Sequence, residues 1–420
     1  MEPSVRAACR HGGGDRRWTR GSGRRPHEAA FAARHRRPGA AQEGISALFQ
    51  AGKGECPVKM SFRWFGEGND TVTLSQIRQI PGVTDIVWSL HDIPAGEEWP
   101  LDRILALRDQ AAAHGLGINV VESVNIHEDI KLGLPSRDAY IENYIKTMEK
   151  LAQAGVKVIC YNFMPVFDWL RTDLHHPSGD GSTALFYEKS RIENVDPFEL
   201  VRQINANSTL TMPGWEPERL SHLASLFEAY RGVTEEHLWD HLKYFLDKVI
   251  PAAETLGIRM AIHPDDPPWP IFGLPRIITG QDNLRRFLAL HDSPANGITL
   301  CSGSLGANPA NDIVGMIHEF ADRIPFAHIR NVKVFDNGDF IETSHRTQDG
   351  TVDIAGIVKA YHDIGFDGYA RPDHGRHIWD EQCRPGYGLY DRALGIMYLW
   401  GLWDAAGYRA PSAAKEGHAS

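Results

Sequence analysis

Two patterns of apolar and polar positions alternate along the chain from about residue 60. Short apolar runs bounded by glycine or proline are each followed by a stretch whose apolar residues recur every three or four positions. The first pattern is typical of buried strands and the second of helices that pack on a sheet. The predicted strands are Ser61–Gly66, Asp85–Leu90, Ile118–Glu122, Val156–Phe163, Ile258–His263, Gly297–Cys301, Ile324–Asn331 and Tyr369–Asp373.

Helices are predicted between these strands. Thr234 opens one of them, because two glutamates follow it in the first turn, and Gly257 ends it. The other predicted helices are Leu74–Gln79, Leu101–His114, Arg137–Ala154, Gln281–Leu290, Asn311–Ala321, Ile354–His362 and Gly388–Leu402.

The strand–helix unit recurs about eight times, which predicts an α/β fold of the closed (β/α)8 TIM-barrel type. An open doubly wound sheet is the competing fold. It normally has a glycine-rich phosphate turn after its first strand, and residues 65–69 (FGEGN) lack the G-x-G-x-x-G spacing. We therefore predict one barrel domain over residues 60–409.

Residues 165–233 interrupt this rhythm after the fourth strand. They contain no clear strand pattern, several prolines and glycines, and many aromatic residues. A connection of this length is usually functional, so we predict a lid or rim insertion.

Both ends of the chain differ in composition from the barrel. Residues 1–59 are rich in Gly, Ala and Arg without a sustained period, and we predict that they and residues 410–420 are disordered. An Arg-rich transit peptide is one interpretation of the first segment. The interpretation that we favour is that Met60 is the true start of the protein.

The formal net charge of -10 is unevenly distributed, because residues 1–59 are basic and the remainder is strongly acidic. An acidic body argues against nucleic acid as a partner. No apolar run is long enough to predict a membrane span. The 5 cysteines are odd in number and scattered, which predicts no disulfide framework and a reducing cytoplasmic location.

Polar residues gather at the predicted carboxyl ends of the strands, where barrel enzymes place their active sites. They are His91, Asn125, His127, Asn162, His263, Asp265, Cys301, Ser302, His328, Arg330, Arg371, Asp373 and His374.

Four of these residues predict a metal site, because they end four consecutive strands and carry metal-binding groups: His263, Cys301, His328 and Asp373. Each alone has a structural explanation, such as a buried thiol or a helix cap, but their joint occurrence favours a metal. The donor types suit zinc, ferrous iron or cobalt, and they suit manganese less well because of the thiolate.

Other residues near these strand ends suit a polyhydroxylated acid, because arginine binds carboxylates while amides and imidazoles bind hydroxyl groups. The predicted substrate-binding residues are Asn125, His127, Asn162, Asp265, Arg330 and Arg371. His374 follows a predicted metal ligand and Tyr387 precedes the last helix, so both are candidates for acid–base catalysis. An aromatic contact at the start of that helix is the structural alternative for Tyr387.

Several motifs resemble one known family. They are residues 64–66 (WFG), 122–131 (ESVNIHEDIK), 160–169 (CYNFMPVFDW), 171–173 (RTD), 263–268 (HPDDPP), 301–304 (CSGS), 328–330 (HIR) and 371–375 (RPDHG). On these motifs the chain resembles mannonate dehydratase from Met60 to about Leu402. The extension before Met60 is not part of the family's pattern, and residues 175–232 resemble it only loosely.

The resemblance implies a TIM-type barrel that dehydrates D-mannonate to 2-dehydro-3-deoxy-D-gluconate in hexuronate (glucuronate) catabolism. It also implies manganese or ferrous iron (Mn2+ or Fe2+) held by the four predicted ligands, and a dimer or higher homo-oligomer. A metal-dependent sugar isomerase or epimerase on the same barrel, or a sugar-acid-binding protein without catalysis, are the alternatives.

Overall fold

The computed structural model describes residues 58–194, 196, 199 and 222–407. These residues belong to one compact unit, Glu55–Ser420. Lys59, which the sequence analysis assigned to the extension, begins the first strand. The rest of the predicted disordered extension, apart from Val58, lies outside the described residues, as do the predicted tail and residues 200–221 of the insertion.

Eight parallel strands close into a barrel, which confirms the predicted fold. Their order around the barrel is β1-β12-β9-β8-β7-β4-β3-β2. The strands are β1 (Lys59–Arg63), β2 (Val83–Trp88), β3 (Gly117–Glu122), β4 (Val158–Tyr161), β7 (Arg259–Ile262), β8 (Asn296–Cys301), β9 (Phe326–His328) and β12 (Tyr369–Arg371).

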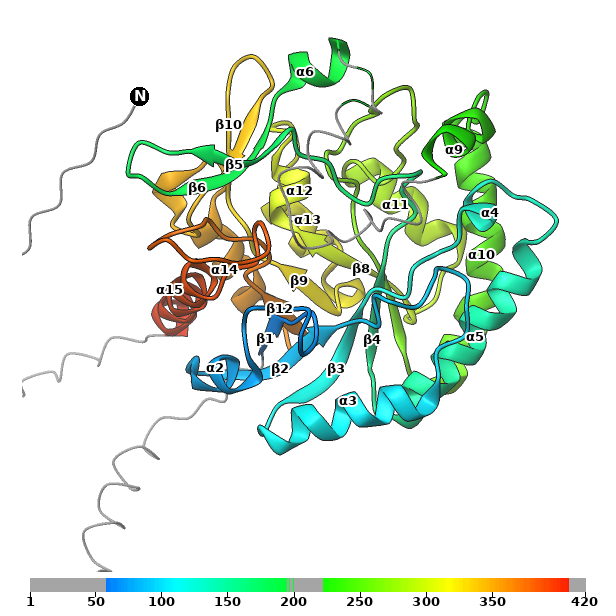
Figure 1. Cartoon of the computed structure of the whole chain (residues 1–420), viewed down its shortest axis with the longest axis horizontal. Coiled ribbons are helices and arrows are strands. Elements are labelled where there is room, and N and C mark those ends of the chain that lie inside the picture. Colours follow the sequence, from blue (N-terminus) through cyan, green and yellow to red (C-terminus); the bar gives the residue numbers. More distant parts are fainter. Residues whose placement is uncertain (1–57, 195, 197–198, 200–221, 408–420) are drawn as a thin grey trace, which may run out of the picture. The chain divides into compact units, whose positions relative to one another are not determined.

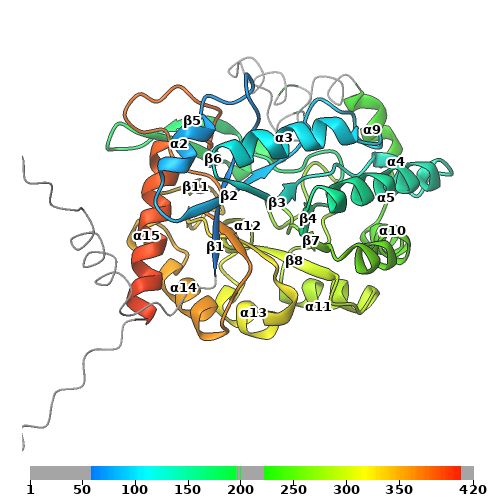
Figure 2. The ribbon, with the colours of Figure 1, turned by 90° about the horizontal axis from the view of Figure 1, so that it is seen from below.

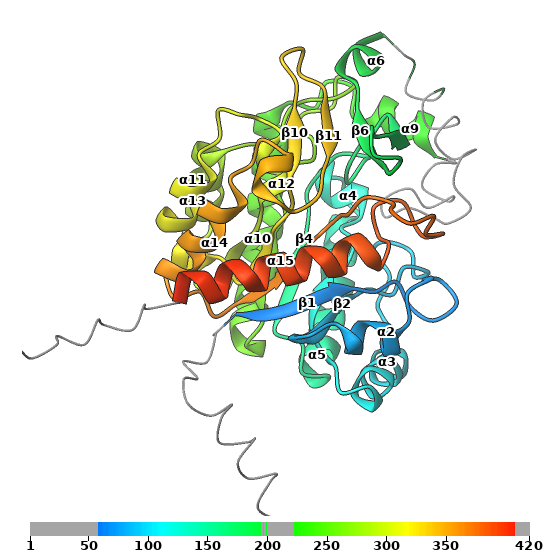
Figure 3. The ribbon, with the colours of Figure 1, turned by 90° about the vertical axis from the view of Figure 1, so that its left-hand side faces the viewer.

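Helices lie outside the strands, as Figures 1 and 2 show. The N-cap of the longest, α10, is Thr234, whose side chain accepts a hydrogen bond from the His237 amide, and Gly257 ends it with φ 64°. The principal outer helices are α2 (Leu74–Gln79), α3 (Leu101–Ala113), α5 (Arg137–Gln153), α10 (Glu235–Leu256), α11 (Gln281–Leu290), α13 (Ile313–Glu319), α14 (Ile354–Asp363) and α15 (Tyr390–Gly407). Figure 3 shows α15 beside α14, on which it packs.

The apolar core has two parts. A small cluster fills the inside of the barrel and includes Val120, Cys160, Ala261 and Phe326. A much larger cluster joins the outer faces of the strands to the helices. Because side chains alternate across a strand, Ala261 and Phe326 direct the residues two positions later, His263 and His328, toward the barrel axis.

A second, four-stranded sheet corrects the prediction that residues 165–233 contain no strand. Its order is β10-β11-β6-β5, and Figures 1 and 3 show these strands together at one end of the barrel. The strands are β5 (Asp173–Pro177), β6 (Thr183–Tyr187), β10 (Val332–Val334) and β11 (Phe340–Glu342).

The prediction failed because β5 reads DLHHP, without apolar alternation and with a terminal proline. β5 is extended because it pairs antiparallel with β6, and β6 pairs with β11, which is distant in the sequence. The described residues also form four short α-helices, α4 (Glu128–Lys131), α6 (Lys189–Asn194), α9 (Leu223–Ala229) and α12 (Ser302–Gly306), and two 3-10 helices, η1 (Ala321–Arg323) and η2 (Thr347–Asp349). None of the described helices combines the length and the apolar character that crossing a bilayer requires.

Candidate active site

Strand register brings the predicted ligands of neighbouring strands to one level of the barrel. Cys301 on β8 is the register partner of His328 on β9, and His328 is the partner of Arg371 on β12. His263 follows β7 directly, next to β8 in the barrel. The carboxyl ends of these strands therefore converge on a small volume.

His263, Cys301 and His328 form a compact donor group, with one ligand atom of each lying within 4.8 Å of the others. The Nε2 atom of His263 is 3.1 Å from Nδ1 of His328. Nδ1 of His263 donates to the Pro264 carbonyl at 2.7 Å, which leaves the lone pair of Nε2 directed at the group. The Cys301 sulfur accepts hydrogen bonds from the amide and the hydroxyl of Ser304.

Asp373 lies beside this group, with Oδ2 3.6 Å from the Cys301 sulfur and 3.8 Å from Nδ1 of His328. Its backbone is left-handed, with φ 59°, a conformation that aspartate tolerates better than most residues and that recurs at functional sites. Burial alone would raise the pKa of Asp373, but the neighbouring His374 and Arg371 hold that pKa well below its ordinary value. The carboxylate is therefore ionised and faces the donor group.

A second group, Glu122, Cys160 and His328, has similar spacing. The guanidinium of Arg371 already provides a positive charge beside this group. Its Nη2 is 2.9 Å from Glu122 Oε1, and its Nε donates to His328 Nε2 at 3.0 Å. Burial also raises the pKa of the Cys160 thiol well above its ordinary value. The group containing Cys301 is therefore the better candidate for a metal.

Glu342, His374 and Tyr387 form a hydrogen-bonded chain. The two carboxylate oxygens of Glu342 lie 2.9 and 3.0 Å from Nδ1 of His374, and Nε2 of His374 lies 2.9 Å from the Tyr387 hydroxyl. Nδ1 of His374 also lies 2.7 Å from Nη1 of Arg330, so a carboxylate and a guanidinium both face this nitrogen. The pair predicted for acid–base chemistry is thus in direct contact and is oriented by a carboxylate.

The ionisation states of Glu342 and Tyr387 are set by burial and by neighbouring charged residues. Burial would raise the pKa of Glu342, but His374 and Arg330 lower it to about 2. Burial raises the pKa of the Tyr387 phenol above its ordinary value, and Arg371 offsets only part of this effect. Tyr387 is therefore protonated at neutral pH, so the residue is present as a hydroxyl donor and not as a phenolate.

Arg330 is bound to the protein from several sides. Its Nη2 atom is 2.7 Å from Asp266, and its Nη1 atom is 3.2 Å from Glu342 and 3.3 Å from Asp373. Arg171, which precedes β5, binds the same Asp266 and Glu342. Its guanidinium is thus paired with carboxylates of the protein while it lines the site, and substrate binding by Arg330 stays a prediction.

The other predicted substrate-binding residues divide into two sets. Asn125, Asn162 and Arg371 line a cavity of about 70 Å³ together with His263, Asp373, His374 and Tyr387. Asp265 is not among the described residues that line it, because its carboxylate accepts from the Ile278 amide at 2.8 Å.

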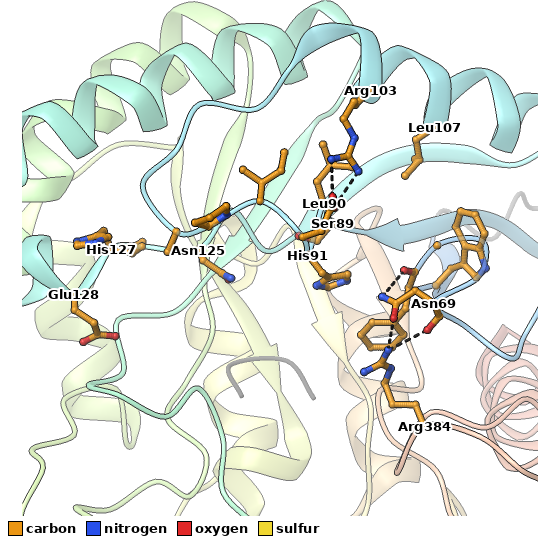
Figure 4. Close-up of a pocket in the computed structure, with 18 of the residues that line it drawn as sticks. Asn69, Ser89, Leu90, His91, Arg103, Leu107, Asn125, His127, Glu128 and Arg384 are labelled. Carbon is orange, nitrogen blue, oxygen red and sulfur yellow. Dashed lines mark hydrogen bonds and ion pairs between the residues drawn. The ribbon is translucent and has the colours of Figure 1, made fainter. Parts of the chain in front are cut away.

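His127 lines a neighbouring cavity of about 1380 Å³, caps α4 and stacks on Tyr140. Figure 4 shows His91 in this cavity between Asn125 on one side and the bonded pair Asn69 and Arg384 on the other. His91 and Asn125 line both cavities, so the two spaces adjoin.

Sequence reasoning missed five residues of the charged cluster around the site: Arg63, Glu122, Arg171, Asp266 and Glu342. Glu122, Arg171 and Asp266 lie within motifs that carried the family resemblance, so a signal was available for them. Glu342 follows an ordinary short apolar pair, and Arg63 lay inside a predicted strand that extended past the observed end of β1.

A closed parallel barrel with convergent ionisable side chains at the carboxyl ends of its strands defines a (β/α)8-barrel enzyme. A family model described as D-mannonate dehydratase (UxuA) matches residues 58–411. The chain belongs to the D-mannonate dehydratase family.

Individual relatives agree with this assignment. Mannonate dehydratase 1 of Bacillus licheniformis is 71% identical over 358 residues, covering 85% of this chain and 98% of the relative. The mannonate dehydratase of Bacillus subtilis (strain 168) is 60% identical over 348 residues, covering 83% and 97%. The crystal structure of mannonate dehydratase from Streptococcus suis serotype2 superposes with a TM-score of 0.76 at 46% identity, covering 85% of this chain and 99% of that chain.

A substitution at Gly303 tests how much the stability of the fold depends on the ion pairs of Arg330. A side chain at this position would collide with the Arg330 guanidinium, so Gly303→Ala should displace the fork and leave Asp266 and Asp373 poorly compensated. We expect the free energy of unfolding to fall by about 3 kcal/mol. Urea denaturation measures it, and Gly179→Ala, where an added methyl group meets open space, should change it by less than about 0.5 kcal/mol. Equal effects of the two substitutions would contradict the role of the Arg330 ion pairs.

Proposed function

We propose that this chain dehydrates D-mannonate to 2-dehydro-3-deoxy-D-gluconate, a step of hexuronate catabolism. Membership of the D-mannonate dehydratase family supports this activity. The observation that carries the proposal is that Asp373, His374 and Tyr387 line one cavity together with His263, a member of the donor group.

The proposed metal is Mn2+ or Fe2+, held by His263, Cys301, His328 and Asp373. Ligand atoms at about 2.0–2.3 Å from one ion lie up to roughly 4.6 Å apart, which is compatible with the spacing of the donor group within 4.8 Å. Two imidazoles, a thiolate and a carboxylate favour ferrous iron on softness, and manganese is proposed from the family. When bound, the metal supplies a Lewis acid that stabilises negative charge on the substrate's carboxylate or C2 oxygen.

Dehydration requires removal of the C2 proton and protonation of the departing C3 hydroxyl. We assign the first task to His374 and propose that Glu342 holds the proton on Nδ1, which leaves Nε2 as the acceptor. We assign the second to Tyr387, because burial keeps its phenol protonated. Their contact at 2.9 Å lets the proton taken by the imidazole replace the one that the phenol donates.

The remaining predicted residues act around this pair. Asn125 and Asn162 line the cavity and are proposed to bind substrate hydroxyl groups. Arg330 and Arg371 are proposed to hold Asp373 and Glu122 in place, because those ion pairs occupy their forks. Asp265 and His127 remain predictions for substrate binding, and their contacts describe loop anchoring and helix capping.

The activity is tested on the full chain by metal analysis together with D-mannonate turnover. We expect about one metal per chain, formation of a 2-keto-3-deoxy product, and loss of both in Cys301→Ala, because the variant lacks one ligand. Cys383→Ala, a half-buried thiol elsewhere, should keep both. Metal without product would redirect the function to a sugar isomerase or epimerase, and sugar-acid binding without product would indicate a binding protein.

Separate variants test the acid–base pair. Tyr387→Phe and His374→Asn should each lower the turnover number at least about 100-fold while metal content stays unchanged, because each removes a proton-transfer group. The matched controls are Tyr144→Phe, a buried tyrosine on α5, and His362→Asn, on α14. Turnover within about threefold of the parent would remove that residue from the mechanism.

A homo-oligomer in the cytoplasm is the proposed state. Cys160, Cys301 and Cys383 are free thiols, as expected in a reducing compartment. The large side chains Tyr390, Leu394 and Met397 are 41%, 49% and 46% exposed and share one face of α15.

A second copy of the chain is proposed to cover this face of α15. Light scattering should give the mass of a dimer or higher oligomer, and Leu394→Glu should lower that mass by placing a charge in the interface. Lys248→Glu, an exposed position on α10, should not change the mass. A monomeric parent chain would contradict the proposal.

A further inference from the structure

Three arginines line the small cavity, and they differ in their partners. Arg330 is paired with Asp266, Glu342 and Asp373. Arg371 is paired with Glu122 and Asp373, each at 2.9 Å. Among the residues that the structure describes, no carboxylate forms an ion pair with Arg63, the last residue of β1.

Arg63 is nevertheless buried, with an exposed fraction of 3%. Its Nη2 atom donates to Nε2 of His91 at 3.1 Å, and its Nη1 atom is buried without a hydrogen-bond partner. A buried guanidinium with an unused donor is costly unless a ligand completes it. Burial lowers the pKa of Arg63, whereas the pKa of the equally buried Arg371 is raised because its carboxylate partners outweigh desolvation.

Glu122 is the carboxylate whose charge acts most on Arg63, but its ion pair is with Arg371, and the other close neighbours of Arg63 are neutral or positive. An arginine cannot accept a hydrogen bond, so Nε2 of His91 is the acceptor and the imidazole is neutral. Burial, with the charges of Arg63 and Arg384, lowers the pKa of His91 well below its ordinary value. Arg384 and Arg63 lie 4.3 and 4.7 Å from the ring centroid of Phe65, so a second cation shares the same aromatic ring.

The geometry points to Arg63 as the residue that binds the carboxylate of the sugar acid. A carboxylate oxygen would accept the hydrogen bond that Nη1 of Arg63 does not make within the protein. The inference rests on the proposed function and adds to it the group that selects an acid over a neutral sugar. β1 adjoins β12 in the barrel, so this cation lies next to the strand that leads to Asp373. A carboxylate held there could keep its C2 carbon near His374 and Tyr387, which line the same cavity.

The experiment measures binding without turnover. The 3-deoxy analogue of D-mannonate retains the carboxylate but lacks the hydroxyl that leaves, and its neutral amide removes only the charge. Calorimetric titration of the Mn2+-loaded full chain with both probes should show preference for the acid. Arg63→Met should weaken binding of the acid about 100-fold and binding of the amide less than about threefold, because a buried charged partner is lost only for the acid.

Two further variants separate recognition from folding. Arg63→Lys keeps the charge without the planar fork, so it should weaken acid binding by about tenfold and leave amide binding unchanged. Arg103→Met removes an arginine that lines the neighbouring cavity and pairs with Asp92 at 2.7 Å, and it should bind both probes like the parent. Circular dichroism reports whether Arg63→Met folds, and Arg63→Lys carries the test if it does not.

The outcomes distinguish this inference from the proposed function. Equal weakening of acid and amide in the Arg63 variants, or no change in either, overturns the role of Arg63 even if the parent dehydrates D-mannonate. An acid preference that depends on Arg63 in a chain that does not dehydrate D-mannonate would retain the carboxylate site and overturn the activity.

Discussion

The site depends on one constraint: charges buried together must be paired inside the protein. Arg330 meets it by binding Asp266, Glu342 and Asp373, which come from three separate segments of the chain. Because each carboxylate is desolvated, the loss of one partner would leave a buried charge at a cost of about 3–5 kcal/mol. The same ion pairs that stabilise the fold therefore fix the position of Asp373 beside the metal-type donor group.

This constraint also explains why the second sheet matters for the chemistry. Glu342 ends β11, outside the barrel, yet its carboxylate both binds Arg330 and accepts from His374. Its pKa of about 2 keeps it ionised at neutral pH, so a charged carboxylate on a strand of the second sheet faces Nδ1 of His374. The second sheet therefore contributes a carboxylate that contacts the proposed acid–base pair directly.

The sequence predicted the barrel because apolar periodicity reports directly on strands buried on both faces, and strand ends such as Cys301 and His328 followed from it. It did not predict the second sheet, since short edge strands such as DLHHP are ordered by distant pairing. It selected Asp265 where Asp266 lines the cavity, because a loop has no periodicity that assigns a direction to adjacent residues. A strand predicted three residues too long concealed Arg63 as a strand end.

The distribution of charge suggests how a protein with a net charge of -10 can take an anionic substrate. Long-range attraction does not favour the approach of a sugar acid to an acidic surface, and salt screens such fields within about 10 Å. Affinity for the anion must then come from desolvated cations at short range, where the interaction is stronger than in water. The buried arginines at the ends of β1 and β12 are in that position, and only the one on β1 lacks a carboxylate partner among the described residues. On the proposed role of Arg63, recognition of the substrate's charge is separated from the ion pairs that maintain the fold.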